Sequence, residues 1–176
     1  MQNFINISLE IFYALMGFLM IVIAYKSFTT INNNKKYGTS LFWILISLPF
    51  IFGRLIPANI IGIILILSSL LTLSKQVVFA KYEEPDENFG KEQADKLKNK
   101  IFIPSLILAF AAVVVAMSLS NFDNSSQFAI GVGSIIALIS ALIITKAKPA
   151  TSVQDGSRLL QQMGPASMLP QLLVAL

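Results

Sequence analysis

The stretch QFAIGVGSIIALISALIIT, residues 127–145, contains no charged side chain along its 19 residues. A helix needs about 20 mostly apolar residues to cross the roughly 30 Å hydrocarbon core of a bilayer, so this stretch predicts a transmembrane helix. Small residues recur on one face of that helix, at Gly133, Ala137, Ser140 and Ala141. Because small side chains let helix backbones approach closely in lipid, we expect this face to pack against another helix.

The rest of the chain shares this apolar character. Of its 176 residues, 55% are hydrophobic and only 12% are charged, and the mean hydropathy is +0.73. A soluble domain is usually about one-quarter charged, and a domain of this size could not bury so much apolar surface. We therefore predict an all-α integral membrane protein, with residues 1–176 forming a single transmembrane domain.

Several classes of function are disfavoured by the residues that the sequence lacks. The chain has no cysteine and no histidine, which removes thiolate nucleophiles, imidazole bases and the usual zinc ligands. The apolar stretches hold no pair of aspartates and no base beside their serines. The net charge of +4 is spread between apolar blocks rather than gathered into one stripe. The sequence therefore predicts no catalytic site, cofactor, bound metal or nucleic-acid partner.

Four further apolar stretches predict membrane-spanning helices and bring the expected number to five. These stretches are Ser8–Tyr25, Ser40–Ile56, Ala58–Leu73 and Ile101–Leu119. The second and third are short and meet at a turn around Pro57, so a hairpin that dips into the membrane from one side is an alternative there. We prefer two spans, because only two spans preserve the alternation of charge described next.

The lysine and arginine residues alternate cleanly between the two ends of these stretches. They follow the first, third and fifth stretches and are absent from the other connections. Since basic loops face the cytoplasm, this pattern predicts that the N-terminus lies outside the cell. Residues 74–100 then form a charged cytoplasmic loop. Glu92 and Lys96 stand four residues apart, so we expect a surface helix that continues into the fourth span.

Two charged residues, Glu10 and Arg54, fall inside the predicted spans. Charge within a bilayer is costly and needs a partner or water. The predicted topology places Glu10 in the first turn of its span and Arg54 in the last turn of its own, both near the outer surface. We expect the two side chains to form a structural ion pair there, or each to extend to the headgroups.

The final stretch, RLLQQMGPASMLPQLLVAL at residues 158–176, is apolar but interrupted by Gly164-Pro165 and Pro170. One interpretation is a re-entrant hairpin over residues 157–176, whose broken helix would present free backbone N–H groups to an anion. The candidate substrate-binding residues are then Gly164, Pro165, Ser167, Pro170 and Gln171. The other interpretation is a sixth span kinked by proline. The residues alone leave both open.

Three strings carry a family resemblance: GTSLFWILISLPFIFGRLIP at 38–57, NKIFIPSLIL at 99–108 and QDGSRLLQQMGPASMLPQLLVAL at 154–176. They resemble a family of bacterial multi-pass membrane proteins numbered 979 among domains of unknown function. Members of that family are described as subunits of a 5-oxoproline (pyroglutamate) transporter. They resemble the ion-transporter superfamily, which uses inverted repeats and hairpins that dip into the membrane, and they accompany a second membrane subunit from a sister family.

The resemblance implies a hairpin signature at Asp155, Gly156 and Arg158, continued by the interrupted residues at 164–171. It also implies that this sequence is the N-terminal portion of a longer subunit. We therefore expect a permease subunit that moves a small organic anion such as 5-oxoproline, with coupling to Na⁺ or H⁺ left open. The expected partners are the lipid bilayer, the second membrane subunit and the anionic substrate. The alternative is a membrane scaffold or assembly subunit that transports nothing.

Overall fold

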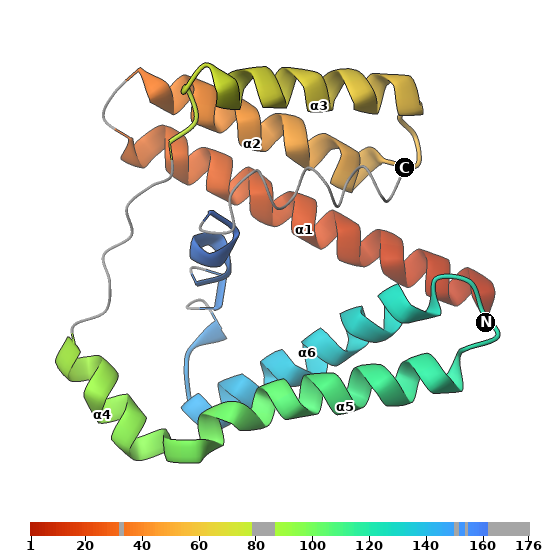
Figure 1. The fold of residues 1–176 in the computed structure, drawn as a ribbon, viewed down its shortest axis with the longest axis vertical. Helices are drawn as coiled ribbons and strands as arrows, with labels where there is room; N and C mark the ends of the chain where they lie inside the picture. Colours follow the sequence, from red (N-terminus) through yellow and green to blue (C-terminus); the bar gives the residue numbers. More distant parts are fainter. Residues whose placement is uncertain (32–33, 79–86, 150–151, 154, 162–176) are drawn as a thin grey trace. The chain divides into compact units, whose positions relative to one another are not determined.

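The computed structural model describes residues 1–31, 34–78, 87–149, 152–153 and 155–161. All regular secondary structure in these ranges is helical, which confirms the predicted all-α class (Figure 1). The elements are α1 (Gln2–Thr30), α2 (Lys35–Phe52), α3 (Ala58–Leu73), α4 (Glu87–Leu97), the 3₁₀ helix η1 (Lys98–Phe102), α5 (Ile103–Ser118) and α6 (Ser125–Thr145). A further helical segment covers residues 155–161.

Three stretches of helix are long and apolar enough to cross a membrane. They are Gln2–Thr30, Gly90–Ser118 and Ser125–Thr145. The 16 residues of α3 are also apolar but shorter, at about 24 Å of helix. The 18 residues of α2 begin on Lys35 and Lys36 and are less apolar than α3.

The predicted helix boundaries differ from the observed ones mainly in α1 and α2. Helix α1 begins six residues before the predicted Ser8 and ends five residues after the predicted Tyr25. The next largest difference is in α2. This helix begins five residues before the predicted Ser40 and ends at Phe52, four residues before the predicted Ile56. The first turn of a helix needs no apolar side chains, so the lysines at its start do not prevent it. By contrast, α3 has the predicted bounds, since Pro57 precedes its first residue and the apolar run stops at Ser74.

The chain forms two compact units, and the first comprises Met1–Phe12 and Glu83–Ser152. Within it, α5 and α6 run antiparallel (Figure 1). A Cβ built on Gly133 would lie 3.1 Å from the carbonyl oxygen of Leu108 and 3.4 Å from the Cβ of Ala112. Gly133 and Ala137 are buried against this neighbour. The prediction that the small face of this helix packs on another helix is therefore confirmed.

The first turns of α1 close the apolar core of the first unit. Ile5 and Leu9 are buried with Phe128 of α6. Gln2 fixes the loop between α5 and α6, because its amide nitrogen donates to the carbonyl of Asp123 at 3.1 Å and its amide oxygen accepts from the backbone N–H of Asp123 at 3.0 Å.

The surface helix predicted ahead of the fourth span is present as α4 and η1. The Nζ of Lys96 lies 3.9 Å from an Oε2 oxygen of Glu92, as their spacing predicts, and both side chains are exposed. Exposed pairs of this kind contribute only about 0.3–0.5 kcal/mol, so the helix depends mainly on its continuity with α5.

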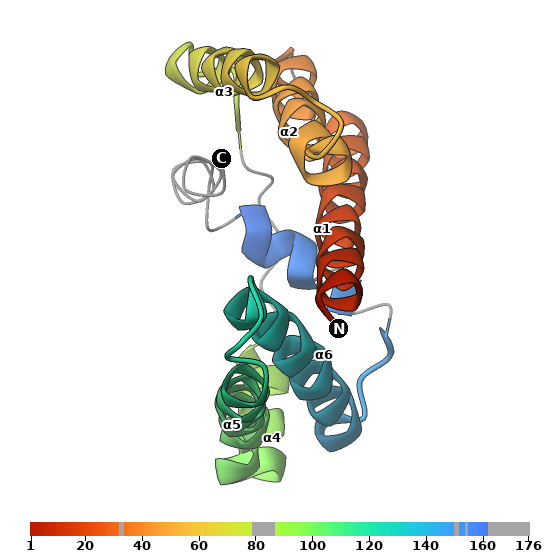
Figure 2. The ribbon, with the colours of Figure 1, turned by 90° about the vertical axis from the view of Figure 1, so that its right-hand side faces the viewer.

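The second unit comprises Tyr13–Tyr82 and Val153–Leu176. Its helix α2 lies between α1 and α3 in both views (Figures 1 and 2). The buried core gathers apolar side chains from α1, α2, α3 and residues 155–161, and consists of Met20, Ile23, Ala24, Phe42, Trp43, Ile46, Ile61, Leu65 and Leu160. The hydroxyl of Ser40 donates to the carbonyl of Ala24 at 2.9 Å, which links α2 to α1 within this core.

Thr39 joins the chain that leaves α3 to the first turns of α2. Its side chain is fully buried. Its hydroxyl accepts from the backbone N–H of Val78 at 3.0 Å and lies 3.3 Å from the carbonyl oxygen of Gln76. Gln76 and Val78, which follow Lys75, are thereby held against α2.

Candidate functional site

The residues predicted to bind substrate lie outside the part of the chain that the structure describes. Gly164, Pro165, Ser167, Pro170 and Gln171 all follow the last described residue, Gln161. The structure does describe the helical segment that leads into them, residues 155–161. This segment holds part of the signature implied by the family resemblance, and its side chains form the candidate site.

Residues 155–161 present one buried face and one exposed face. Ser157, Leu160 and Gln161 are 0%, 8% and 2% exposed. A Cβ built on Gly156 would lie 3.8 Å from the side chain of Leu19 on α1, which is ordinary contact. The burial of positions 157, 160 and 161 follows the period of an amphipathic helix, so the segment docks into the second unit by its apolar and neutral side.

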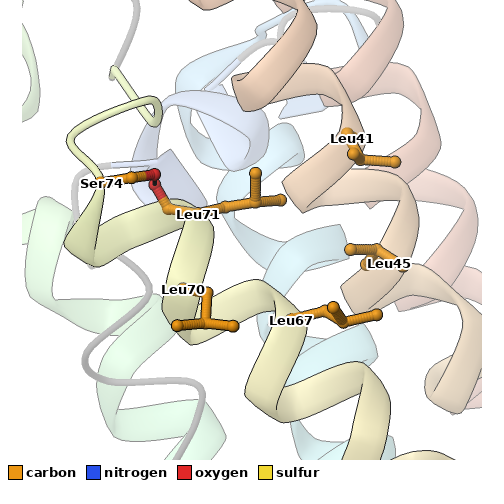
Figure 3. Close-up of a pocket in the computed structure, with 6 residues that line it drawn as sticks. All are labelled: Leu41, Leu45, Leu67, Leu70, Leu71 and Ser74. Carbon is orange, nitrogen blue, oxygen red and sulfur yellow. Dashed lines mark hydrogen bonds between the residues drawn. The ribbon is translucent and has the colours of Figure 1, made fainter.

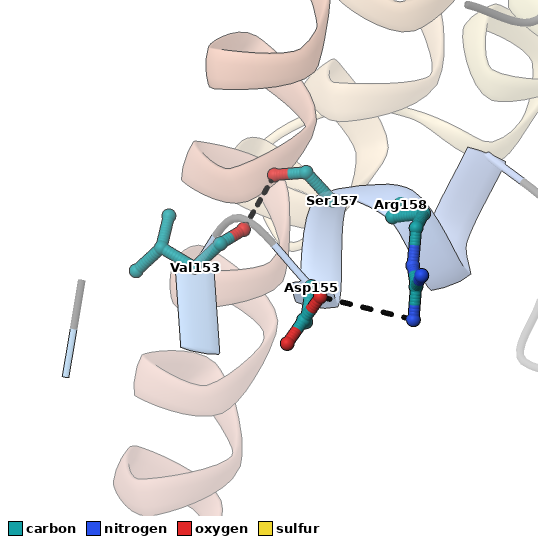
Figure 4. Close-up of polar contacts among 4 residues, drawn as sticks. All are labelled: Val153, Asp155, Ser157 and Arg158. Atoms are coloured by element: carbon teal, nitrogen blue, oxygen red, sulfur yellow. Dashed lines mark hydrogen bonds and ion pairs between the residues drawn. The ribbon is translucent and has the colours of Figure 1, made fainter. Parts of the chain in front are cut away.

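The buried polar side chains on this face, Ser157 and Gln161, are uncharged. The hydroxyl of Ser157 donates to the carbonyl oxygen of Val153 at 2.7 Å, one helical turn earlier (Figure 4). Such a bond satisfies the hydroxyl inside its own helix. The side chain therefore occupies the interface with no desolvated donor left over.

Arg158 provides the positive charge closest in sequence to the predicted break. An Nη of its guanidinium lies 3.8 Å from a carboxylate oxygen of Asp155 (Figure 4). Asp155 is mostly exposed, at 63%, whereas Arg158 is only 28% exposed. The Nε atom of Arg158 is buried and makes no hydrogen bond within the described residues. One edge of the guanidinium is therefore engaged, while a second N–H donor lacks an acceptor.

This arrangement suits recognition of a carboxylate. A guanidinium offers five N–H donors in a planar fork that matches a carboxylate, and such charge-assisted bonds are stronger than neutral ones. A buried donor without an acceptor costs about 1–3 kcal/mol, which an acceptor on a substrate would recover. The sequence already marked Arg158 through the family strings. Its partial burial depends on how residues 155–161 dock, which the sequence does not show.

Two more buried donors of the second unit lack an acceptor among the described residues. They are the hydroxyl of Ser27 on α1 and the indole N–H of Trp43 on α2. Both side chains are 0% exposed. Sequence reasoning missed them, and the only available signal was a single tryptophan within an apolar stretch. They show that the second unit buries polar groups as well as apolar ones.

Glu10 and Arg54 lie at places that differ from the predicted ones. Since α1 begins at Gln2, Glu10 falls in its third turn rather than in a first turn. Since α2 ends at Phe52, Arg54 lies in the turn before α3 rather than inside a helix. Both are exposed. Glu10 belongs to the first unit and Arg54 to the second, and the ion pair between them stays a prediction.

The structure assembles no metal site from the side chains that it describes. Within those ranges, no three acidic residues come together as carboxylate coordination of a cation would need.

Comparison with known proteins gives one match. The family described as "Protein of unknown function (DUF979)" matches residues 10–176, which is nearly the whole chain. No curated protein and no solved structure matches the chain. The match includes residues 155–161 and the interrupted stretch that follows them.

Proposed function

The chain belongs to the DUF979 family, and from this premise we propose that it is a multi-pass membrane subunit of a secondary transporter for a small organic anion. The substrate that we propose to test first is 5-oxoproline, a cyclic amide bearing one carboxylate. A second membrane subunit completes the transporter, and a gradient of Na⁺ or H⁺ drives it. The protein works by binding and release, without catalysis.

The apolar helices support placement in a membrane. Most large side chains on α5 and many on α1 and α6 are exposed apolar groups, which water would not tolerate in this number. In our proposal α1, α2, α3, α5 and α6 are five spans of a bacterial plasma membrane. The N-terminus lies outside, and the lysines of residues 74–100 lie in the cytoplasm.

The observation that carries the anion-binding role is Arg158. Its side chain is partly buried, and its buried Nε–H has no acceptor among the described residues, six residues before the predicted interruption at Gly164. Where a cation is partly removed from water, it attracts a carboxylate more strongly than it does in bulk solvent. The proposed site combines Arg158 with neutral donors from Gly164 to Gln171, which form a re-entrant hairpin.

The test is uptake of radiolabelled 5-oxoproline by cells that express this chain with its second subunit. Arg158→Gln removes the charge, and Arg158→Lys keeps it but loses the planar fork. Loss of one charge-assisted hydrogen bond costs about 1.5–3 kcal/mol, so we expect the KM of the Gln variant to rise about 10- to 100-fold. The Lys variant should fall between the Gln variant and the unchanged protein.

Lys146→Gln is the matched control, because Lys146 is an exposed cation at the end of α6 in the first unit. Uptake that does not depend on this chain would reject the transporter assignment. A KM for Arg158→Gln equal to that of the Lys146→Gln control would reject the role of Arg158.

A second candidate function, a membrane scaffold, is favoured by the close packing of Gly133 on α5. A scaffold needs tight helix packing but has no use for an interrupted helix. The double change Gly164→Leu with Pro165→Ala should abolish uptake if the chain is a transporter subunit. If the chain is a scaffold, the same change should leave both expression and assembly intact.

A further inference from the structure

An apolar groove runs along the outside of the second unit between α2 and α3. It has a volume of about 480 Å³ and is lined by Leu41, Leu45, Leu67, Leu70, Leu71 and Ser74. Figure 3 shows Leu41 and Leu45 on the α2 side and the other residues on the α3 side. Leu67 and Leu70 are 46% and 55% exposed, so the groove is open rather than enclosed.

Ser74 lies at one end of the groove, and Lys75 is the next residue in the chain. The backbone of Lys75 is left-handed, with φ of 55°, and its side chain is exposed. The next residue, Gln76, packs on the first turn of α2, where a Cβ built on Gly38 would lie only 2.7 Å from the Cβ of Gln76. This contact and the hydrogen bonds of Thr39 hold Lys75 beside the start of α2.

The start of α2 adds a second cation at the same end. The Nζ of Lys36 lies 5.1 Å from the ring centroid of Phe28 and 5.2 Å from that of Tyr37. The two rings are 5.7 Å apart, in an edge-to-face arrangement. Both rings are exposed, so this cluster holds an ammonium group at the protein surface.

Tyr37 connects this cluster to the groove. It precedes Leu41 by four residues and Leu45 by eight on the same helix, so the three side chains share one face. An aromatic residue with a polar tip at the end of an apolar surface is typical of the membrane interface. The groove therefore has an apolar length and, beside Ser74, an end that is positive and aromatic.

We propose that the groove and this end form a binding site for one anionic phospholipid. An acyl chain lies against the leucines, the phosphate group lies between Lys36 and Lys75, and the hydroxyl of Tyr37 donates to a headgroup oxygen. The charge of one sign at one end favours this occupant over a helix of another protein, which would need only the apolar part. The inference rests on membrane placement alone and is independent of transport.

The test is native mass spectrometry of the purified chain, mixed with phosphatidylglycerol or with phosphatidylcholine of the same acyl chains. We expect tighter retention of phosphatidylglycerol. Each lysine near a membrane surface contributes about 1 kcal/mol to binding of anionic lipid, so Lys36→Gln and Lys75→Gln should each weaken it about fivefold. Leu70→Trp should weaken binding of both lipids by filling the groove.

The matched controls lie in the first unit. Lys146→Gln removes an exposed cation, and Leu138→Trp enlarges an exposed apolar residue of α6. An unchanged emission spectrum of buried Trp43 identifies the lysine variants that remain folded, and an unchanged melting temperature in detergent does so for the two variants that add a tryptophan. The proposal is overturned if both lipids bind equally, or if the controls lose as much binding as the groove variants. It is also overturned if Leu70→Trp alters only the oligomeric state, since that result would place a helix in the groove.

Discussion

The close approach of α5 and α6 predicts that a disulfide can join them. The chain has no native cysteine, so an introduced pair has no competitor. A Cβ built on Gly133 lies 3.4 Å from the Cβ of Ala112. Disulfides need about 3.5–4.5 Å between Cβ atoms, so Ala112→Cys with Gly133→Cys requires a shift of only about a tenth of an ångström.

The expected outcome is complete intramolecular oxidation. The closed loop spans 21 residues, and a crosslink of that length raises the free energy of unfolding by about 3 kcal/mol through restriction of the unfolded chain. Membranes are treated with copper phenanthroline, and a polyethylene glycol maleimide is then added. Oxidised chains should take up no maleimide, and chains reduced beforehand should take up two, which a gel resolves.

The control pair is Ala112→Cys with Ile139→Cys, because Ile139 lies on an exposed face of the same helix. This pair should remain reactive toward the maleimide after oxidation. If the Gly133 pair stays fully reactive while the Ile139 pair becomes protected, α6 does not face α5 through its small residues. The packing described for the first unit would then be wrong.

Three further predictions concern stability and burial. Thr39→Val should lower the free energy of unfolding by about 1–3 kcal/mol, because it removes the buried hydroxyl that accepts from the N–H of Val78. Thr29→Val on the exposed face of α1 should change it by less than about 0.5 kcal/mol, and equal melting temperatures of the two variants in detergent would contradict this. Gly133→Val should lower the free energy of unfolding by about 1–3 kcal/mol through overpacking. Gly62→Val should melt at the temperature of the unchanged protein, because a Cβ built there meets no atom within 4 Å. A larger fall in melting temperature for Gly62→Val than for Gly133→Val would refute the assignment of helix faces. The single tryptophan, Trp43, is 0% exposed, so its emission should be blue-shifted and resist quenching by acrylamide, and a water-like spectrum would show that the core of the second unit is misassigned.

Local chemistry explains which parts of the fold were predictable from the sequence. The bounds of α3 follow from Pro57 at one end and from Ser74 and Lys75 at the other. The apolar run and the residues that flank it were therefore enough to predict this helix. The start of α2 was missed because Lys35 and Lys36 look like loop residues, although a helix can begin on charged side chains. The small face of α6 was predictable because its spacing alone defines it.

The candidate site was less accessible to sequence reasoning. Gly164 and Pro165 mark an interruption by composition, but no pattern states what surrounds it. The core that contains Trp43 also includes Leu160, more than 100 residues later in the chain, and no local spacing encodes such a contact. The positive end of the α2–α3 groove is similar, because contacts of Gly38 and Thr39 with residues 76–78 hold the chain after Lys75 against the start of α2.

The bridge from Thr39 to Gln76 and Val78 has a topological consequence. The turn at residues 53–57 joins α2 to α3 covalently at one end. At the other end, the hydrogen bonds of Thr39 join α2 to the residues that follow α3, so the two helices are connected at both ends. After a single protease cut in that turn, the two fragments would remain associated through these hydrogen bonds. New chain ends could be opened there, and a reporter sequence inserted, without freeing α3 from the rest of its unit.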